Sequence, residues 1–269
     1  MRVMKKINKY VAFSLILCFG TLILFQGDVS SEEVNIVGST SIQPVCEDLV
    51  EEYRKNHSKS EITVQGGGSN MAIKCVNAGI ADIGMCSKQL NNDYNFTEYE
   101  LGREGIVVAV HPSNNISDLT IDEIKGIFDG NITNWNQLGG ENKPINVFVR
   151  EEGSGTLDAF KTTIMNKTPI LKEAIVLNSQ GSIKQAIEQD ISSIGIVSFT
   201  YLDENIKALS IRGIYPSNES IADGSYPLQR PFLLLINDDS SNETQNFIKW
   251  INSSQANEIL DENRIIRGV

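Results

Sequence analysis

The chain has 269 residues, which is enough for one large domain or two ordinary ones. Hydrophobic residues make up 41% and charged residues 21%, a globular composition that excludes a disordered tail. Asp and Glu together number 34 against 23 for Lys and Arg, so the net charge is −11. This acidity argues against non-specific binding to nucleic acid or anionic lipid, because such binding needs a basic face.

The first residues differ from the rest of the chain. Arg2 and three lysines up to Lys9 precede an apolar run over 11–25, and a polar stretch follows. A basic start before a short apolar run predicts an export signal, since a membrane-spanning helix needs about 20 apolar residues. We expect residues 1–31 to be an export signal or a retained N-terminal anchor. The protein would then be periplasmic or lie on the outer face of the cytoplasmic membrane.

Cysteine and histidine are too scarce and too scattered for a metal site. Beyond the leader the chain has Cys46, Cys75 and Cys86 without CxxC spacing, and its only histidines are His57 and His111. A structural zinc site takes four such ligands at short spacings. We therefore expect no metal and no cofactor. The cysteines are interpreted as small buried residues, while a Cys46–Cys75 bridge stays open.

The first half of the chain alternates strand, glycine turn and helix. Pro44 suits the first turn of one helix, and Ser69 can cap another. Ile73, Val76 and Ile80 would share one face of that second helix. The expected strands cover residues 34–37, 61–65 and 81–85.

The second half contains a separate unit between two buried strands. The strands are expected over 105–110 and 230–236, and the unit begins with a strand over 145–149 and a helix that buries Leu157, Phe160 and Ile164. Further helices close the chain. Alternating strands and helices predict mostly parallel sheets. We expect two α/β lobes, an outer one over 32–107 and 231–269 and an inserted inner one over 108–230.

Three strand-to-helix turns combine glycine with hydroxyl residues, at 38–41, 66–69 and 153–156. Glycine lets the backbone approach a ligand, and the first N–H groups of a helix lack internal partners. The helix dipole adds partial positive charge. Each turn alone is more often only a helix cap. Together they favour one oxyanion site at the carboxyl ends of the strands, which needs no positive net charge.

Two charged side chains are candidates for the same site. Arg150 ends a strand before the third turn, and its forked donors match two oxygens of a tetrahedral anion, with Glu152 close enough to brace it. Asp82 could point a carboxylate at the cleft and accept the proton of phosphate, which sulfate lacks. The alternatives are a surface ion pair for Arg150 and a capping or surface role for Asp82.

These segments resemble the phosphate-specific substrate-binding proteins of ABC transporters. The matching stretches follow the family's order after the leader and cover residues 38–44, 64–69, 81–85, 132–135, 150–156 and 226–231. The resemblance implies an α/β, two-lobed periplasmic-binding-protein-like fold of type II. Each lobe would be a mostly parallel sheet flanked by helices, with two crossover strands as the hinge, and the protein would not be an enzyme.

The resemblance also implies a set of site residues. Asp82 matches the carboxylate that accepts the phosphate proton, and Glu152 matches the ion-pair partner of Arg150. Ser39, Gly68 and Glu152 would support the site. The implied phosphate-binding residues are Thr40, Ser41, Ser69, Asp82, Arg150, Ser154, Gly155 and Thr156. The chain departs from the family's pattern at 70–71 and at 86–88.

The resulting hypothesis is an exported, high-affinity receptor for inorganic phosphate that delivers its ligand to a membrane permease by hinge closure. The alternatives are a receptor for sulfate, molybdate or tungstate, and an anchored phosphate sensor. An exported phosphoesterase with Ser154 or Ser41 as nucleophile would need a base, and the chain has no GxSxG motif.

Overall fold

The computed structural model describes residues 33–90 and 94–267. The predicted export signal lies outside the described residues. Within the described part of the chain, no helix has the length and apolarity needed to cross a membrane. Residues Glu32–Val269 form one compact unit.

The first part of the chain alternates strands and helices as expected. Pro44 stands in the first turn of α2, where a proline costs no helical hydrogen bond. The expected strand over 105–110 is the second half of a longer strand, β4. The elements are β1 (Glu33–Gly38), α2 (Gln43–Asn56), β2 (Glu61–Gly66), α3 (Ser69–Asn77), β3 (Ile83–Cys86) and β4 (Phe96–Val110).

The middle of the chain adds three parallel strands and their helices. The elements are β5 (Asp118–Leu119), α4 (Ile121–Phe128), η1 (Trp135–Leu138), β6 (Asn146–Arg150), α5 (Gly155–Phe160), η2 (Lys161–Met165), β7 (Ile175–Leu177), α6 (Gln180–Gln189), β8 (Ser193–Ser198) and η3 (Phe199–Tyr201). The remaining elements are β9 (Lys207–Ala208), β10 (Ser210–Ile211), α7 (Asn218–Ala222), β11 (Gln229–Asn237), α8 (Asn242–Trp250) and α9 (Ser254–Glu262).

The described strands form one continuous sheet and a small two-stranded one. The order in the large sheet is β2-β1-β3-β11-β4-β8-β6-β7, with β9 beside β4. The group β2-β1-β3 is parallel, and so is the group β8-β6-β7. Strands β11 and β4 join the two groups through antiparallel pairs. The predicted fold class, with two crossover strands, is confirmed.

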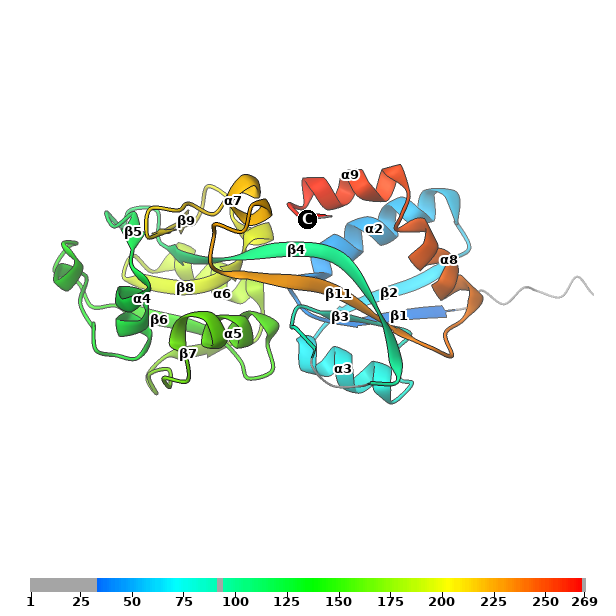
Figure 1. Ribbon diagram of the computed structural model, residues 1–269, viewed down its shortest axis with the longest axis horizontal. Helices are drawn as coiled ribbons and strands as arrows, with labels where there is room; N and C mark the ends of the chain where they lie inside the picture. The colour runs from blue at the N-terminus through cyan, green and yellow to red at the C-terminus, as the bar shows by residue number, and fades with distance from the viewer. Residues whose placement is uncertain (1–32, 91–93, 268–269) are drawn as a thin grey trace, which may run out of the picture. The chain divides into compact units, whose positions relative to one another are not determined.

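Strand β4 belongs to both parallel groups. Its residues 96–105 pair with β11, and its residues 106–110 pair with β8. Figure 1 shows β4 and β11 side by side as they pass from the elements around β1–β3 to those around β6–β8. Any change in the angle between the two groups must therefore bend these two strands.

The apolar core is divided in the same way. The inner core, as we call it, is built from residues between Ile106 and Leu228. The outer core is built from residues between Val34 and Leu101 and between Phe232 and Ile265. The exact lobe boundaries, 32–107 with 231–269 and 108–230, stay a prediction.

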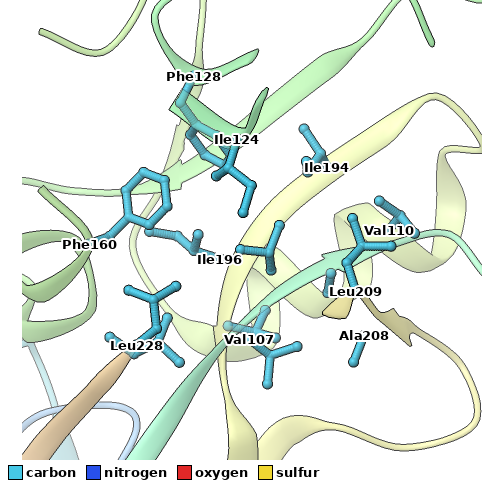
Figure 2. Packing of buried hydrophobic residues seen from close by; sticks show 14 of the residues in the cluster. Val107, Val110, Ile124, Phe128, Phe160, Ile194, Ile196, Ala208, Leu209 and Leu228 are labelled. Atoms are coloured by element: carbon cyan, nitrogen blue, oxygen red, sulfur yellow. The ribbon is translucent and has the colours of Figure 1, made fainter. Parts of the chain in front are cut away.

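Helices cover the sheet by burying apolar side chains against it. Figure 2 shows Val107 of β4, Ile196 of β8, Ile124 of α4 and Phe160 of α5 gathered in the inner core. The rings of Phe128 and Phe160 lie 4.5 Å apart between their centroids. Full burial of one such side chain contributes about 1.5–3 kcal/mol, so the helices are held mainly by this packing.

The predicted face of α3 needs correction. The helix ends at Asn77, and Gly79 follows with a positive φ of 66°, a conformation common after helix ends. Ile80 therefore lies beyond the helix and is 71% exposed. The buried face instead carries Ala72 and Val76.

The cysteines of the described residues are free thiols. Cys46 and Cys86 are buried, as expected for small apolar residues, and Cys75 is half-buried. The bridge between Cys46 and Cys75 that the sequence left open is not formed. Burial raises the pKa of the Cys86 thiol to about 11, so this group stays protonated at neutral pH.

Candidate anion-binding site

Five hydroxyl side chains gather where β1 and β3 end and where α3 and α5 begin. Ser87 Oγ lies 2.9 Å from Ser39 Oγ and 3.3 Å from Ser69 Oγ. Ser41 Oγ lies 3.5 Å from Thr156 Oγ1. All five side chains are at most 3% exposed. We call Ser39, Ser41, Ser69, Ser87 and Thr156 the hydroxyl cluster.

Two glycines allow this close approach. Gly38 has a φ of 138°, and a Cβ there would lie 2.3 Å from the Met85 carbonyl oxygen. A Cβ on Gly155 would lie 2.3 Å from the Ser87 carbonyl oxygen and 2.4 Å from Ser87 Oγ. No other residue fits either position without moving the backbone. The glycines of the predicted turns thus bring β1 against β3, and α5 against Ser87.

Arg230 connects the hydroxyl cluster to the crossing strands. It lies on β11 and is 2% exposed. Its Nη2 donates to Ser41 Oγ at 2.8 Å, and its Nη1 donates to Thr156 Oγ1 at 2.6 Å and to Ser87 Oγ at 3.2 Å. Thr156 belongs to α5 on the side of the inner core, whereas Ser41 and Ser87 adjoin the outer core. A single guanidinium therefore holds groups from both sides.

Glu104 of β4 is the ion-pair partner of Arg230. Its Oε2 accepts from Arg230 Nε at 3.0 Å, and its Oε1 accepts from Ser198 Oγ and from the Thr200 N–H. Burial raises the pKa of the Glu104 carboxyl, and the charge of Arg230 opposes that rise. Burial likewise lowers the pKa of Arg230, but a guanidinium stays charged in a protein. The pair forms a buried, hydrogen-bonded salt bridge.

Gln180, the first residue of α6, adds an amide to the cluster. Its Nε2 donates to Thr156 Oγ1 at 2.5 Å and to Ser41 Oγ at 3.0 Å. Its Oε1 accepts from the Ser198 N–H at 2.9 Å, which fixes the orientation of the amide. The Gln180 N–H donates to Thr40 Oγ1 at 3.4 Å. Gln180 thus supplies donors that the sequence analysis did not identify.

Thr40 also contacts Tyr201. The Tyr201 hydroxyl donates to the Thr40 carbonyl oxygen at 3.0 Å. Burial raises the pKa of Tyr201 to about 12, so the phenol remains a donor at neutral pH. Thr40 is 7% exposed and Ser154, which precedes α5, is 1% exposed. Both predicted residues are therefore buried beside the cluster.

Arg150 is a second buried guanidinium, at the end of β6, and is 2% exposed. Its Nε and Nη2 donate to the two carboxylate oxygens of Glu151, each at 2.8 Å, and Nη2 also donates to the Asn178 carbonyl oxygen at 3.2 Å. Burial is the main cause of the lowered pKa of Arg230, and the charge of Glu104 opposes it. The positive charge of Arg150 lowers this pKa further. The charge of Arg150 therefore acts on Arg230 in the same direction as burial does.

The structure corrects the predicted partner of Arg150. Glu152 is 79% exposed and pairs with Lys161, whereas the adjacent Glu151 chelates the guanidinium. The chain turns sharply at Gly153, which has a φ of 90°, and Glu152 lies on the outside of this turn. Gly68, another predicted supporting residue, precedes α3 and faces the Glu151 carboxylate.

The structure also does not bring Asp82 to the cluster. Asp82 precedes β3, and its carboxylate accepts from the Asn35 N–H at 2.9 Å. Ser87 follows the same strand at its other end. A strand rises about 3.3 Å per residue, so β3 separates the two residues. The hydrogen bond of Asp82 therefore lies at the amino ends of β1 and β3, whereas the hydroxyl cluster lies at their carboxyl ends.

Ser69 differs from its predicted capping role. The residue before α3 is Gly68, and no side chain caps the helix. Ser69 is fully buried, and its Oγ accepts from the Ser87 N–H at 3.0 Å. Its hydroxyl is therefore directed into the cluster.

Sequence reasoning missed Ser87, Gln180, Glu104 and Arg230. Ser87 and Arg230 lie inside or next to stretches that carried the family resemblance. The residue that follows the strand was the available signal for Ser87, because ligands in parallel sheets sit at the carboxyl ends of the strands. A charged residue within an apolar strand was the available signal for Arg230.

The two histidines of the described residues contact groups outside the hydroxyl cluster. Within residues 33–90 and 94–267, no cluster of three or more His, Cys, Asp or Glu residues could hold a metal ion. The histidines contact other groups: His57 Nδ1 lies 3.0 Å from the Tyr53 carbonyl oxygen and His111 Nδ1 lies 2.7 Å from Ser113 Oγ. Nucleophilic catalysis needs a base beside the nucleophile.

The fold is that of the PBP superfamily, whose domain model matches residues 26–255. The phosphate-binding protein PstS of Bacillus subtilis is 31% identical over 206 residues, which cover 74% of this chain and 68% of that protein. The PstS protein of Borreliella burgdorferi is 25% identical over 92% of this chain and 95% of its own length. The chain belongs to the family of PstS phosphate-binding proteins.

Solved structures agree with this assignment. A Clostridium perfringens protein, classified as a phosphate ABC transporter substrate-binding protein and solved with bound phosphate, superposes with a TM-score of 0.84 at 31% identity. The alignment covers 88% of this chain and all of that one. An ABC-type phosphate transport receptor from Vibrio cholerae superposes with a TM-score of 0.72, also at 31% identity and with the same coverage.

Proposed function

We propose that this protein is an exported receptor that binds inorganic phosphate in the hydroxyl cluster and delivers it to the permease of an ABC transporter. The observation that carries the proposal is the convergence of buried donors from both cores on one point. Arg230 and Gln180 each contact hydroxyls from both sides. Similarity to PstS proteins and to a phosphate-bound structure supports the choice of ligand.

The proposed ligand residues combine the prediction with the structure. From the sequence we retain Thr40, Ser41, Ser69, Arg150, Ser154, Gly155 and Thr156, with Ser39 and Gly68 in support. From the structure we add Ser87, Gln180 and Arg230. Asp82 and Glu152 are left out, because their carboxylates contact other groups.

Phosphate would be held by local donors, as an acidic chain requires. Glu151 balances the charge of Arg150, and Glu104 balances that of Arg230. The net attraction must then come from hydroxyl groups, the Gln180 amide and the unpaired N–H groups at helix starts. A hydrogen bond to a charged group stabilises by about 1.5–3 kcal/mol, so a few such bonds suffice for tight binding.

Hinge closure is the proposed mechanism of capture and release. Besides the contacts of Gln180, Tyr201 and Arg230 already described, two more join the sides. The Asn70 N–H donates to the Gly153 carbonyl oxygen at 3.2 Å, and Lys88 forms an ion pair with Asp158. Only the closed form assembles the complete donor set. Phosphate would therefore shift the population toward closed molecules, and the permease would recognise that form.

Calorimetry with phosphate tests the proposal. We expect saturable binding of one phosphate per chain by the purified protein. Thr156→Val removes a hydroxyl from the cluster with little change of volume, and we expect it to weaken binding by at least about tenfold. Thr162→Val is the matched control, because Thr162 is exposed and its hydroxyl donates only to the Asp158 carbonyl oxygen.

Two results would contradict the proposal. The first is the absence of phosphate binding by protein with a cooperative unfolding transition. The second is equal weakening by both threonine substitutions, which would place the ligand elsewhere. Turnover of a chromogenic phosphate ester would instead favour the phosphoesterase alternative.

A further inference from the structure

A pocket of about 840 Å³ lies beside the hydroxyl cluster. Ser87 and Arg230 of the candidate site line it, together with residues of α3 on the side of the outer core and of α5 on the side of the inner core. Lys88 and Asp158 also line this pocket, and they form an ion pair with each other. The two sides of the molecule therefore meet here through opposite charges.

Both partners of this ion pair adjoin the proposed phosphate site. Lys88 directly follows Ser87, and Asp158 lies in the first turn of α5, two positions after Thr156. The side chains of Lys88 and Asp158 are 20% and 33% exposed. An ion pair that is partly shielded from water is screened less by salt than one on an open surface. The pair can therefore contribute to holding the two sides together.

Asn70, in the first turn of α3, adds to this contact. Its Oδ1 accepts from Lys88 Nζ at 2.9 Å, which fixes the lysine side chain in place. Its N–H donates to the Gly153 carbonyl oxygen at 3.2 Å. A Cβ at Gly153 would lie 2.6 Å from Asn70 Nδ2, so the two sides are closely packed at this point. Ion pair and packing together form one contact region beside the ligand site.

A second ion pair at the same pocket does not join the two sides. Lys161 also lines the pocket, and it pairs with Glu152. Both residues belong to the side of the inner core, one before and one after α5. Movement of the two sides apart would separate Lys88 from Asp158 but would leave the pair of Lys161 and Glu152 intact. The chain thus contains its own control for the effect of joining the sides.

On the basis of the function proposed above, we propose that the ion pair of Lys88 and Asp158 is a latch that stabilises the closed form and slows the release of bound phosphate. In the open form both charges are separate and hydrated, so the pair stabilises the closed form alone. A contact that favours the binding-competent form raises the apparent affinity without touching the ligand. The latch therefore controls how long phosphate stays bound.

Asp158→Asn is the decisive test, because direct electrostatics and the latch predict opposite signs. Asp158 is a negative charge near an anion site, so its removal alone would strengthen phosphate binding. If the latch exists, we expect Asp158→Asn to raise the phosphate Kd about threefold to tenfold. Calorimetry measures Kd. Glu152→Gln is the matched control, a carboxylate paired with a lysine of the same pocket, and should leave Kd within about twofold.

The rates of binding separate a latch from general damage to the site. Stopped-flow measurement should show faster phosphate release from Asp158→Asn, by the same factor as Kd, with an association rate within about twofold of the unmodified protein. Tight phosphate binding by the unmodified protein, with equal or tighter binding by Asp158→Asn, would overturn the latch and leave the proposed function intact. Failure of the unmodified protein to bind phosphate would overturn both.

A double-mutant cycle is the second test. Lys88→Met should also raise the phosphate Kd, and the double variant Lys88→Met with Asp158→Asn should bind no more than about twofold more weakly than Lys88→Met alone, because the ion pair is already lost. Lys161→Met removes a lysine from the same pocket and should leave Kd within about twofold. Multiplication of the two single effects, or an equal effect of Lys161→Met and Lys88→Met, would overturn the latch.

Discussion

The two buried arginines, Arg150 and Arg230, are equally hidden at 2% exposure but are held in different ways. Arg150 is chelated by Glu151, its neighbour in sequence, and contacts the Asn178 carbonyl oxygen on the same side of the molecule. Arg230 is held by Glu104 on the adjacent crossing strand and donates to hydroxyls from both sides.

The difference shows that a charged residue of the binding site can also stabilise the fold. The environment of Arg150 is local and partly exposed, since Glu151 retains 29% of its side-chain exposure. The Arg230–Glu104 pair is almost completely buried, with exposures of 1% and 0%. Loss of one charge from a fully buried pair leaves the other without compensation. We therefore expect Arg230 to matter for stability and binding, and Arg150 mainly for binding.

The largest expected effect is that of Arg230→Met. It should lower the free energy of unfolding by about 3–5 kcal/mol, because Glu104 remains buried without its partner. Phosphate binding should be lost. Denaturant titration measures the first effect and calorimetry the second. The double variant Arg230→Met with Glu104→Gln should recover part of the stability but not the binding. A loss of less than about 1 kcal/mol in the free energy of unfolding of Arg230→Met would contradict the proposed role of Arg230 in stability.

Arg150→Met should have a smaller effect on stability. The Glu151 carboxylate can be hydrated once its partner is gone, so we expect a loss of about 1–3 kcal/mol. Phosphate affinity should still fall at least about tenfold, because a buried donor beside the ligand is removed. The same two measurements apply. Equal destabilisation by Arg150→Met and Arg230→Met would contradict the proposed difference between Arg150, which is held by its neighbour in sequence, and Arg230, which contacts both sides.

The smallest effect separates two adjacent glutamates. Glu151→Gln removes the charge that orients Arg150, and we expect phosphate affinity to change by about threefold to tenfold. Glu152→Gln is the matched control: its side chain is 79% exposed and should change stability and affinity by less than about 0.5 kcal/mol. Equal effects of the two substitutions in calorimetry would show that Glu151 does not orient the guanidinium.

Much of the fold followed from local pattern. The strands that end at Gly38 and Gly66, the helix with Pro44 in its first turn, and the buried side chains of Leu157, Phe160 and Ile164 all lie where the sequence predicts them. These features depend on contacts between near neighbours. The end of α3 was missed, because Ala78 and Gly79 stop the helix before the apolar pattern stops.

The candidate site was only partly predictable. The glycine-hydroxyl turns and Arg150 were found because each is a short motif with a clear chemistry. Gln180 was missed because it begins a helix that carries no glycine turn, and its contact with Ser41 spans 139 residues. Glu104 and Arg230 face each other only through the register of two antiparallel strands, and they are 126 residues apart in the chain.

The sequence alone therefore determined the class of fold, the turns rich in hydroxyl groups and the acidity that requires local donors. The tertiary structure alone decided which charges meet: Glu151 rather than Glu152 at Arg150, Glu104 at Arg230, and Ser87 rather than Asp82 at the hydroxyl cluster. The physical reason is that backbone pattern depends on neighbours in sequence, whereas a side chain's partner depends on strand register and on which end of a strand it occupies.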